Sequence, residues 1–142
     1  MQKATQLKNL FDLRLLYVED DEQAQLVMQR ILKRRFSDIV SAKDGQEALD
    51  VFLEGNVDIA IIDMNIPLLN GLELCMRIRE RNEDMPIMMI TAFDQSDCLL
   101  KALEIGVDRF LFKPINMEIL DKQLKILARR AILFKQYLGV VV

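Results

Sequence analysis

Short apolar runs alternate with segments of helical periodicity along the chain, and this alternation limits the possible folds more than any other feature. The runs are rich in Ile, Val, Leu, Met and Phe, and they are short enough to be buried strands. The predicted strands are Leu13–Val18, Asp38–Ala42, Val57–Ile62, Pro86–Thr91 and Arg109–Phe112.

After each run, apolar residues recur every three or four positions, which predicts a helix with one buried face. The expected helices are Gln23–Arg35, Gly45–Glu54, Leu69–Arg81, a helix capped by Asp94 that ends at Ile105, and a long last helix capped by Asn116. The alternation predicts an α/β fold in which helices cover both faces of one doubly wound parallel sheet. The pattern leaves the strand order open, but in both common orders ligands bind at the carboxyl ends of the strands.

The composition suits a single domain and excludes several kinds of site. The chain has 142 residues, of which 51% are apolar, and it has no histidine, the usual general base and zinc ligand. Cys75 and Cys98 lack CxxC spacing and are expected to be free thiols. A net charge of −3 argues against a nucleic-acid-binding surface across the domain.

A cytoplasmic protein without membrane insertion is expected, because no apolar run is long enough to cross a membrane and Met1–Lys8 lacks the apolar core of a signal peptide.

Polar residues stand at the carboxyl ends of four predicted strands. Glu19 and Asp20 open an acidic run after the first strand, and Asp63 follows the third. Thr91 ends the fourth strand, and Lys113 follows the fifth. Each residue alone could be a solvated loop residue, a helix cap or an ordinary strand residue. Because ligands bind at this edge in doubly wound sheets, their joint occurrence predicts a site.

The residue types in this set can accept a phosphoryl group. Converging carboxylates repel one another, and Mg²⁺, which prefers oxygen ligands, relieves that repulsion. Asp63 could attack phosphorus and form an acyl phosphate. Lys113 and the metal would balance the charge of the transferred oxygens, and Thr91 would donate a hydrogen bond to one of them.

Four pieces of the sequence, taken in order, resemble the response-regulator receiver domain of two-component signalling. They are L-L-Y-V-E-D-D, I-I-D-M-N-I-P-L-L-N-G, M-I-T-A and F-L-F-K-P-I. The resemblance covers roughly Asp12 to Lys125, so residues 1–125 are expected to form the receiver domain. It implies the flavodoxin-like fold of chemotaxis regulators, with five helices, an extended last helix and the strand order 2-1-3-4-5.

The resemblance also implies roles for single residues. Asp63 would be the phosphorylated aspartate, and Lys113 and Thr91 would assist its phosphorylation. The ligands of Mg²⁺ or Mn²⁺ would be Asp20, Asp63, the backbone carbonyl of Asn65 and, through water, Glu19. The peptide bond between Lys113 and Pro114 is typically cis in this family.

Thr91 and Phe110 match the switch pair of the family. The threonine moves toward the phosphoryl group and the ring turns inward, which changes a binding surface. Phe110 lacks the hydroxyl of the tyrosine found in many members, so only the packing part of the switch is expected here. The surface would be formed by the helix ending at Ile105, the strand Arg109–Phe112 and the last helix. Phe93 either shields the acyl phosphate from water or merely packs in its loop.

The last helix is longer than packing on the sheet requires. A heptad-like stripe comprises Leu120, Leu124, Leu127, Ala131, Phe134 and Leu138, and a second apolar line comprises Ile119, Ile126 and Leu133. The helix either covers its own core and then frays, or its extension, residues 126–142, is a connector or dimerising tail. We favour the second interpretation.

These features predict a receiver that takes a phosphoryl group from a sensor histidine kinase or a histidine phosphotransfer protein and then changes its binding surface. It would phosphorylate and dephosphorylate itself without being a metabolic enzyme, and it could form a homodimer through the switching surface or the last helix. No nucleic-acid contact is expected within the chain.

Three other functions share parts of the pattern. A haloacid-dehalogenase-like phosphatase needs a second aspartate where Asn65 stands. A flavodoxin-like cofactor carrier binds phosphate after the first strand, where Glu19–Glu22 would repel it. A pseudo-receiver used only for protein interaction would lack the acceptor or the metal-binding acids, and this sequence has both.

Overall fold

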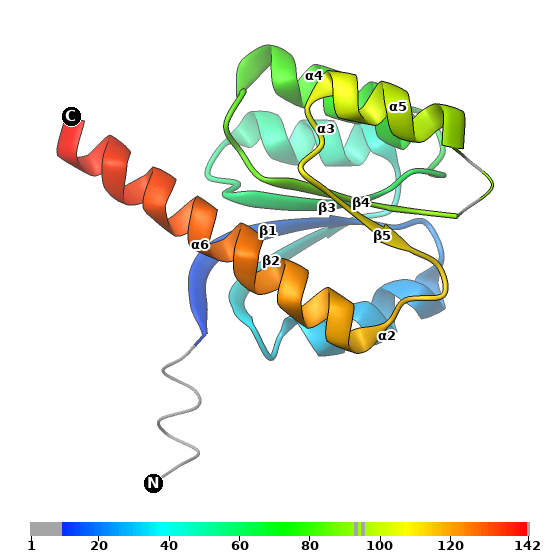
Figure 1. The fold of residues 1–142 in the computed structure, drawn as a ribbon, viewed down its shortest axis with the longest axis horizontal. Coiled ribbons are helices and arrows are strands. Elements are labelled where there is room, and N and C mark those ends of the chain that lie inside the picture. Colours follow the sequence, from blue (N-terminus) through cyan, green and yellow to red (C-terminus); the bar gives the residue numbers. More distant parts are fainter. Residues whose placement is uncertain (1–9, 93, 95, 142) are drawn as a thin grey trace, which may run out of the picture.

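The computed structural model describes residues 10–92, 94 and 96–141, which form a five-stranded parallel sheet between two layers of helices (Figure 1). The strand order is β2-β1-β3-β4-β5, which confirms the order implied by the resemblance. The strands are β1 (Phe11–Val18), β2 (Phe36–Ala42), β3 (Ile59–Asp63), β4 (Ile87–Thr91) and β5 (Arg109–Phe112). The helices are α2 (Glu22–Leu32), α3 (Gly45–Glu54), α4 (Gly71–Arg81), α5 (Ser96–Ile105) and α6 (Met117–Val141).

Helices α3, α4 and α5 cover one face of the sheet, and α2 and α6 cover the other (Figure 1). Successive residues of a strand point to opposite faces, so Leu16 and Val18 belong to the first hydrophobic cluster and Leu15 and Tyr17 to the second. Every residue of β3 and β4 is buried. Burial on both faces explains why these strands are continuous apolar runs rather than alternating ones.

The register of the strands brings their carboxyl ends to one edge of the sheet. The pairs that set this register include Val18 with Ile62, Asp63 with Ile90, and Thr91 with Phe112. The loops that follow β1, β3, β4 and β5 therefore leave the sheet on the same side, where the sequence places its acids, hydroxyl and lysine.

The connection between α2 and β2 differs from the prediction. The helix expected to reach Arg35 ends at Leu32, and β2 begins at Phe36 rather than at Asp38. The ring of Phe36 is buried and lies 5.4 Å from the ring of Phe11, centroid to centroid. This aromatic contact joins the starts of the two strands and lengthens β2 toward its amino end.

Two further boundaries also differ. The helix expected from Leu69 begins at Gly71, because the Asn70 side chain accepts a hydrogen bond from a backbone N–H of the first turn at 2.9 Å. The strand expected from Val57 begins at Ile59.

One of two predicted helix caps is confirmed. The Asn116 side chain accepts hydrogen bonds from two backbone N–H groups in the first turn of α6, at 2.9 and 3.1 Å. The prediction for Asp94 is wrong, because α5 begins at Ser96, two residues later. Residue 95, next to that helix start, and Phe93 lie outside the described residues.

Helix α6 covers the sheet with the first part of its predicted stripe. The buried members of the stripe are Leu120, Leu124, Leu127 and Ala131. Lys135 Nζ lies 3.5 Å from Asp58 Oδ2, and Arg130 lies 3.0 Å from Asp108 Oδ1, so ion pairs hold the helix well beyond residue 125. The Leu138 side chain lies outside the described part of the chain.

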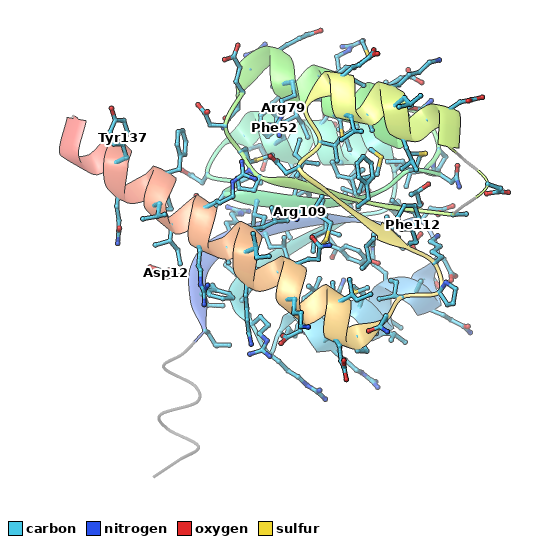
Figure 2. All side chains as sticks on the ribbon, in the orientation of Figure 1. Asp12, Phe52, Arg79, Arg109, Phe112 and Tyr137 are labelled. Carbon is cyan, nitrogen blue, oxygen red and sulfur yellow. The ribbon has the colours of Figure 1, made fainter. Side chains whose placement is uncertain are left out.

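The second apolar line of α6, Ile119, Ile126 and Leu133, is exposed. Tyr137, which is 67% exposed, projects from the last turns of the helix away from the sheet (Figure 2). Among the described residues, no helix is long and apolar enough to span a membrane.

Candidate functional site

The carboxyl edge of the sheet holds a cavity of about 640 Å³ that gathers most of the predicted site residues. Its polar lining includes Glu19, Asp20, Asp63, Asn65 and Lys113. The acids follow β1, Asp63 is the last residue of β3, and Lys113 directly follows β5. Three strands thus deliver carboxylates and an ammonium group to one space, as the sequence led us to expect.

Asp63 is buried at the bottom of this constellation, with 1% of its surface exposed. Lys113 Nζ donates to Asp63 Oδ2 at 2.7 Å. The backbone N–H of Asn65 donates to Asp63 Oδ1 at 2.9 Å. Both oxygens of the carboxylate are therefore oriented, one by a cation and one by the turn that leaves β3.

Lys113 is held in its charged form by this contact. Partial burial works to lower its pKa, but the hydrogen bond and charge of Asp63, together with the charges of Glu19 and Asp20, outweigh burial. The pKa of Lys113 is accordingly raised. The peptide bond between Lys113 and Pro114 is cis, which confirms the expectation from the resemblance.

Glu19 is the second buried carboxylate of the site, with 6% of its surface exposed. Burial and the charge of Asp63 raise the pKa of Glu19 to about 7. The backbone N–H of Asp21, 3.3 Å from Glu19 Oε2, acts in the opposite direction but does not offset them. The ionised form of Glu19 is therefore destabilised by its burial and by the neighbouring Asp63.

The acidic run after β1 divides between two tasks. Glu19 and Asp20 line the cavity beside Asp63. Asp21 caps α2, because its Oδ2 accepts from the Ala24 N–H at 3.3 Å, and Glu22 is the first residue of the helix. A helix amino terminus favours negative charge, so the second half of the run supports the helix. Asp21 lines the cavity as well.

The oxygen donors of the cavity fit a hard cation such as Mg²⁺. Among the described residues, no three Asp, Glu, His or Cys side chains are grouped so that they could hold a metal by themselves. A metal here would thus need ligands besides acidic side chains, such as a backbone carbonyl and water. That mixture suits Mg²⁺, which usually keeps several of its waters.

Thr91 and Phe110 lie behind this cavity rather than in its lining. Thr91 is 1% exposed, and its Oγ1 lies 3.5 Å from Sδ of Met64, the residue after Asp63. Phe110 is half-buried and packs against the hydrophobic cluster on the α3, α4 and α5 face of the sheet. Thr91 belongs to β4, which pairs with β3, and Phe110 belongs to β5, which pairs with β4.

A family model for the response regulator receiver domain matches residues 15–125. The chain belongs to this family.

Known relatives of the receiver support the assignment. Response regulator MprA of Mycolicibacterium vanbaalenii is 34% identical over 117 residues, which are 82% of this chain and 51% of the relative. The PhoP transcriptional regulatory protein for alkaline phosphatase synthesis of Bacillus subtilis is 31% identical over 118 residues, 83% of this chain and 49% of the relative. This chain spans about half the length of these relatives.

Solved structures agree with the fold. The chemotaxis protein CheY4 of Vibrio cholerae is 27% identical to this chain, with a TM-score of 0.73. The match covers 82% of this chain and 98% of CheY4. A co-crystal structure of the Saccharomyces cerevisiae histidine phosphotransfer protein Ypd1 with the receiver domain of Ssk1 also matches, with 28% identity and a TM-score of 0.72. That match covers 80% of this chain and 87% of the matched one. The receiver described here has the flavodoxin-like, CheY-like fold of two-component signalling proteins.

Sequence reasoning missed two residues of the receiver site. Tyr17 lines the cavity although it is 1% exposed, and burial together with the charges of Glu19, Asp63 and Asp21 raises the pKa of its phenol. Met64 contacts Thr91. In the sequence, both resemble ordinary core residues. For Met64 the available signal was its place next to Asp63, and for Tyr17 it was a hydroxyl inside an otherwise aliphatic run.

Proposed function

We propose that this receiver domain accepts a phosphoryl group on Asp63 from the phosphohistidine of a sensor histidine kinase or a histidine phosphotransfer protein, in a Mg²⁺-dependent reaction. The observation that carries the proposal is the buried Asp63 carboxylate, paired with Lys113 at 2.7 Å in a cavity shared with Glu19 and Asp20. The co-crystallised pair of Ypd1 and the Ssk1 receiver supports the class of partner.

The proposed transfer is a direct displacement at phosphorus. One oxygen of Asp63 forms a bond to phosphorus while the bond from phosphorus to the donor's ring nitrogen breaks, and the nitrogen keeps that electron pair. The product is an acyl phosphate on Asp63. The Lys113 ammonium group balances the charge of the transferred oxygens, and Thr91 donates a hydrogen bond to one of them.

The proposed ligands of Mg²⁺, or of Mn²⁺, are Asp20, Asp63, the backbone carbonyl of Asn65 and, through water, Glu19. When bound, the ion supplies positive charge to the transferred oxygens. The raised pKa of Glu19 supports this placement, because the repulsion between Glu19 and Asp63 is what a cation relieves.

Loss of the phosphoryl group to water completes the cycle, so the domain signals without being a metabolic enzyme.

Phosphorylation would change the surface made by α5, β5 and α6. Thr91 turns toward the phosphoryl group and Phe110 moves inward to fill the space. Leu100 and Leu103 of α5 are 64% and 56% exposed, so this surface has apolar side chains available for a partner or a second copy. A cytoplasmic location, where kinases of this kind present their phosphohistidine, belongs to the same proposal.

Residues 126–142 form the proposed connector or dimerising extension of the receiver. The inner side of this segment is occupied, because Leu127 and Ala131 are buried in the receiver's own core. The proposed contacts therefore belong to its outer side, where Ile126, Leu133 and Tyr137 are exposed.

The test is phosphorylation with acetyl phosphate, followed by measurement of the intact mass. We expect a gain of one phosphoryl group in Mg²⁺, and no gain in the Asp63→Asn variant or when the metal is chelated. If no donor phosphorylates the wild-type chain, the proposal fails, and a pseudo-receiver that serves only as an interaction module takes its place.

A further inference from the structure

The hydroxyl of the buried Thr91 is directed at a methionine sulfur. Thr91 Oγ1 lies 3.5 Å from Met64 Sδ, and a sulfur atom is a weak but real acceptor. The Ala92 carbonyl lies 3.4 Å from the same oxygen, which is long for a hydroxyl–oxygen bond of about 2.5–3.0 Å. Thr91 and Met64 are 1% and 3% exposed, so both are shielded from bulk water.

The backbone of Met64 is fixed from both sides. Its N–H donates to the Ile90 carbonyl at 2.9 Å, and its carbonyl accepts from the Gly71 N–H at 3.0 Å. A Cβ at Gly71 would lie 2.7 Å from Met64 Cα, so the start of α4 packs directly on this residue. Met64 is thus anchored between β4 and α4, one residue beyond the acceptor.

We propose that Met64 is a positioning residue, which holds the Thr91 hydroxyl away from Asp63 until a phosphoryl group is present. The inference rests on the proposed function, in which Thr91 donates to that group. A hydroxyl has one proton, so it can donate to the sulfur or to a phosphoryl oxygen but not to both. A charged phosphoryl oxygen is the stronger acceptor and wins the proton after transfer. Met64 therefore sets the equilibrium between the two positions of Thr91 in the resting domain.

Replacing Met64 by leucine should shift this equilibrium. The substitution nearly conserves volume and removes the sulfur acceptor. The buried hydroxyl then loses a partner in the resting position only, so the position that faces Asp63 gains population. We expect beryllofluoride, a mimic of the phosphoryl group, to bind Met64→Leu about threefold to tenfold more tightly than wild type in Mg²⁺.

A double-mutant cycle on the full chain isolates the contact. Beryllofluoride dissociation constants are measured for wild type, Met64→Leu, Thr91→Ala and the double variant. A purely structural effect of the leucine would persist in the Thr91→Ala background, whereas an effect carried by the hydroxyl would vanish there. Met85→Leu is the matched control, because Met85 is buried in the same hydrophobic cluster but precedes the amino end of β4.

The expected result is tighter binding by Met64→Leu, no change in Met85→Leu, and no effect of Met64→Leu once Thr91 is alanine. Equal constants for Met64→Leu and wild type, or an effect of the same size in both backgrounds, would overturn the inference and leave the proposed function intact. A wild-type chain that fails to bind beryllofluoride in Mg²⁺ would instead overturn the proposed function, and the inference with it.

Discussion

The charge of one buried residue, Asp63, shifts the pKa of two neighbouring side chains. It raises the pKa of Lys113 against the effect of burial, and it adds to burial in raising the pKa of Glu19 to about 7. The same carboxylate thus stabilises a positive charge on one side and destabilises a negative charge on the other. Metal binding and phosphoryl transfer, as proposed, would both change the balance of charge around Asp63.

We expect Glu19 to make the metal-free protein less stable as the pH rises from 4.5 to about 7. The unfolded chain loses the Glu19 proton near pH 4.5, but the folded protein keeps it up to about pH 7. The folded state therefore binds more protons in this interval, and its stability falls with rising pH. Thermal unfolding of wild type and Glu19→Gln across the interval measures the effect, which should be weaker in the variant.

Mg²⁺ provides the control for this pH dependence. Above pH 7, where Glu19 is ionised, the ion should raise the melting temperature of the wild-type protein by binding the folded state. The same slope in wild type and Glu19→Gln without metal would show that Glu19 is not the source.

The acids after β1 should separate by function when they are removed one at a time. Asp20→Ala should abolish Mg²⁺-dependent phosphorylation by acetyl phosphate, because Asp20 is a proposed direct ligand of the metal. Glu22→Ala should leave phosphorylation nearly intact, because Glu22 is the first residue of α2 and is exposed. Comparable losses of phosphorylation in the two variants would contradict the division of the acidic run into residues of the site and residues that begin α2.

At the scale of elements, α6 shows what helical periodicity can and cannot predict. The four-three spacing correctly predicted a helix with one apolar face. It could not say whether that face meets a second helix or the protein's own sheet, because both demand the same spacing. Leu127 and Ala131 lie in the core cluster beneath the sheet. Ion pairs at Arg130 and Lys135 hold the helix further, and their acidic partners are distant in sequence.

Replacing a buried side chain of α6 beyond residue 125 by alanine should therefore lower the free energy of unfolding. Leu127 is 0% exposed, so Leu127→Ala should lower the free energy of unfolding by about 2–5 kcal/mol. Leu133 lies six residues further on and is 64% exposed, so Leu133→Ala should change the free energy of unfolding by less than about 0.5 kcal/mol. Urea unfolding of both variants measures the difference, and equal losses would mean that burial along α6 is not as described.

At the scale of the whole molecule, the fold and the rim of the site could be predicted from the sequence. Strand and helix periods differ, and parallel strands deliver their carboxyl ends to one edge, so Asp63 and Lys113 could be placed together although fifty residues separate them. The contact between Met64 and Thr91 could not be predicted, because it depends on side-chain packing between two buried strand ends. The cap of α5 was misplaced because Asp94 is a good cap residue in sequence but lies in a turn before the helix.

The α5, β5 and α6 surface gives a prediction for the assembled molecule. We expect beryllofluoride in Mg²⁺ to promote dimers at high concentration, as followed by sedimentation velocity. Leu103→Glu should weaken the dimer, because Leu103 is exposed on α5. Leu53→Glu is the matched control, since Leu53 is 49% exposed on α3, away from that surface. A chain that stays monomeric with and without beryllofluoride would contradict self-association.

The central claim, that Asp63 takes the phosphoryl group, is tested most directly by locating the acyl phosphate. Borohydride reduces an aspartyl phosphate to homoserine, and peptide mass spectrometry then reads the position of the changed residue. After phosphorylation by acetyl phosphate in Mg²⁺, we predict homoserine at position 63. Homoserine at Asp20 or at another acid, or its absence from a protein that has gained a phosphoryl group, would contradict the account.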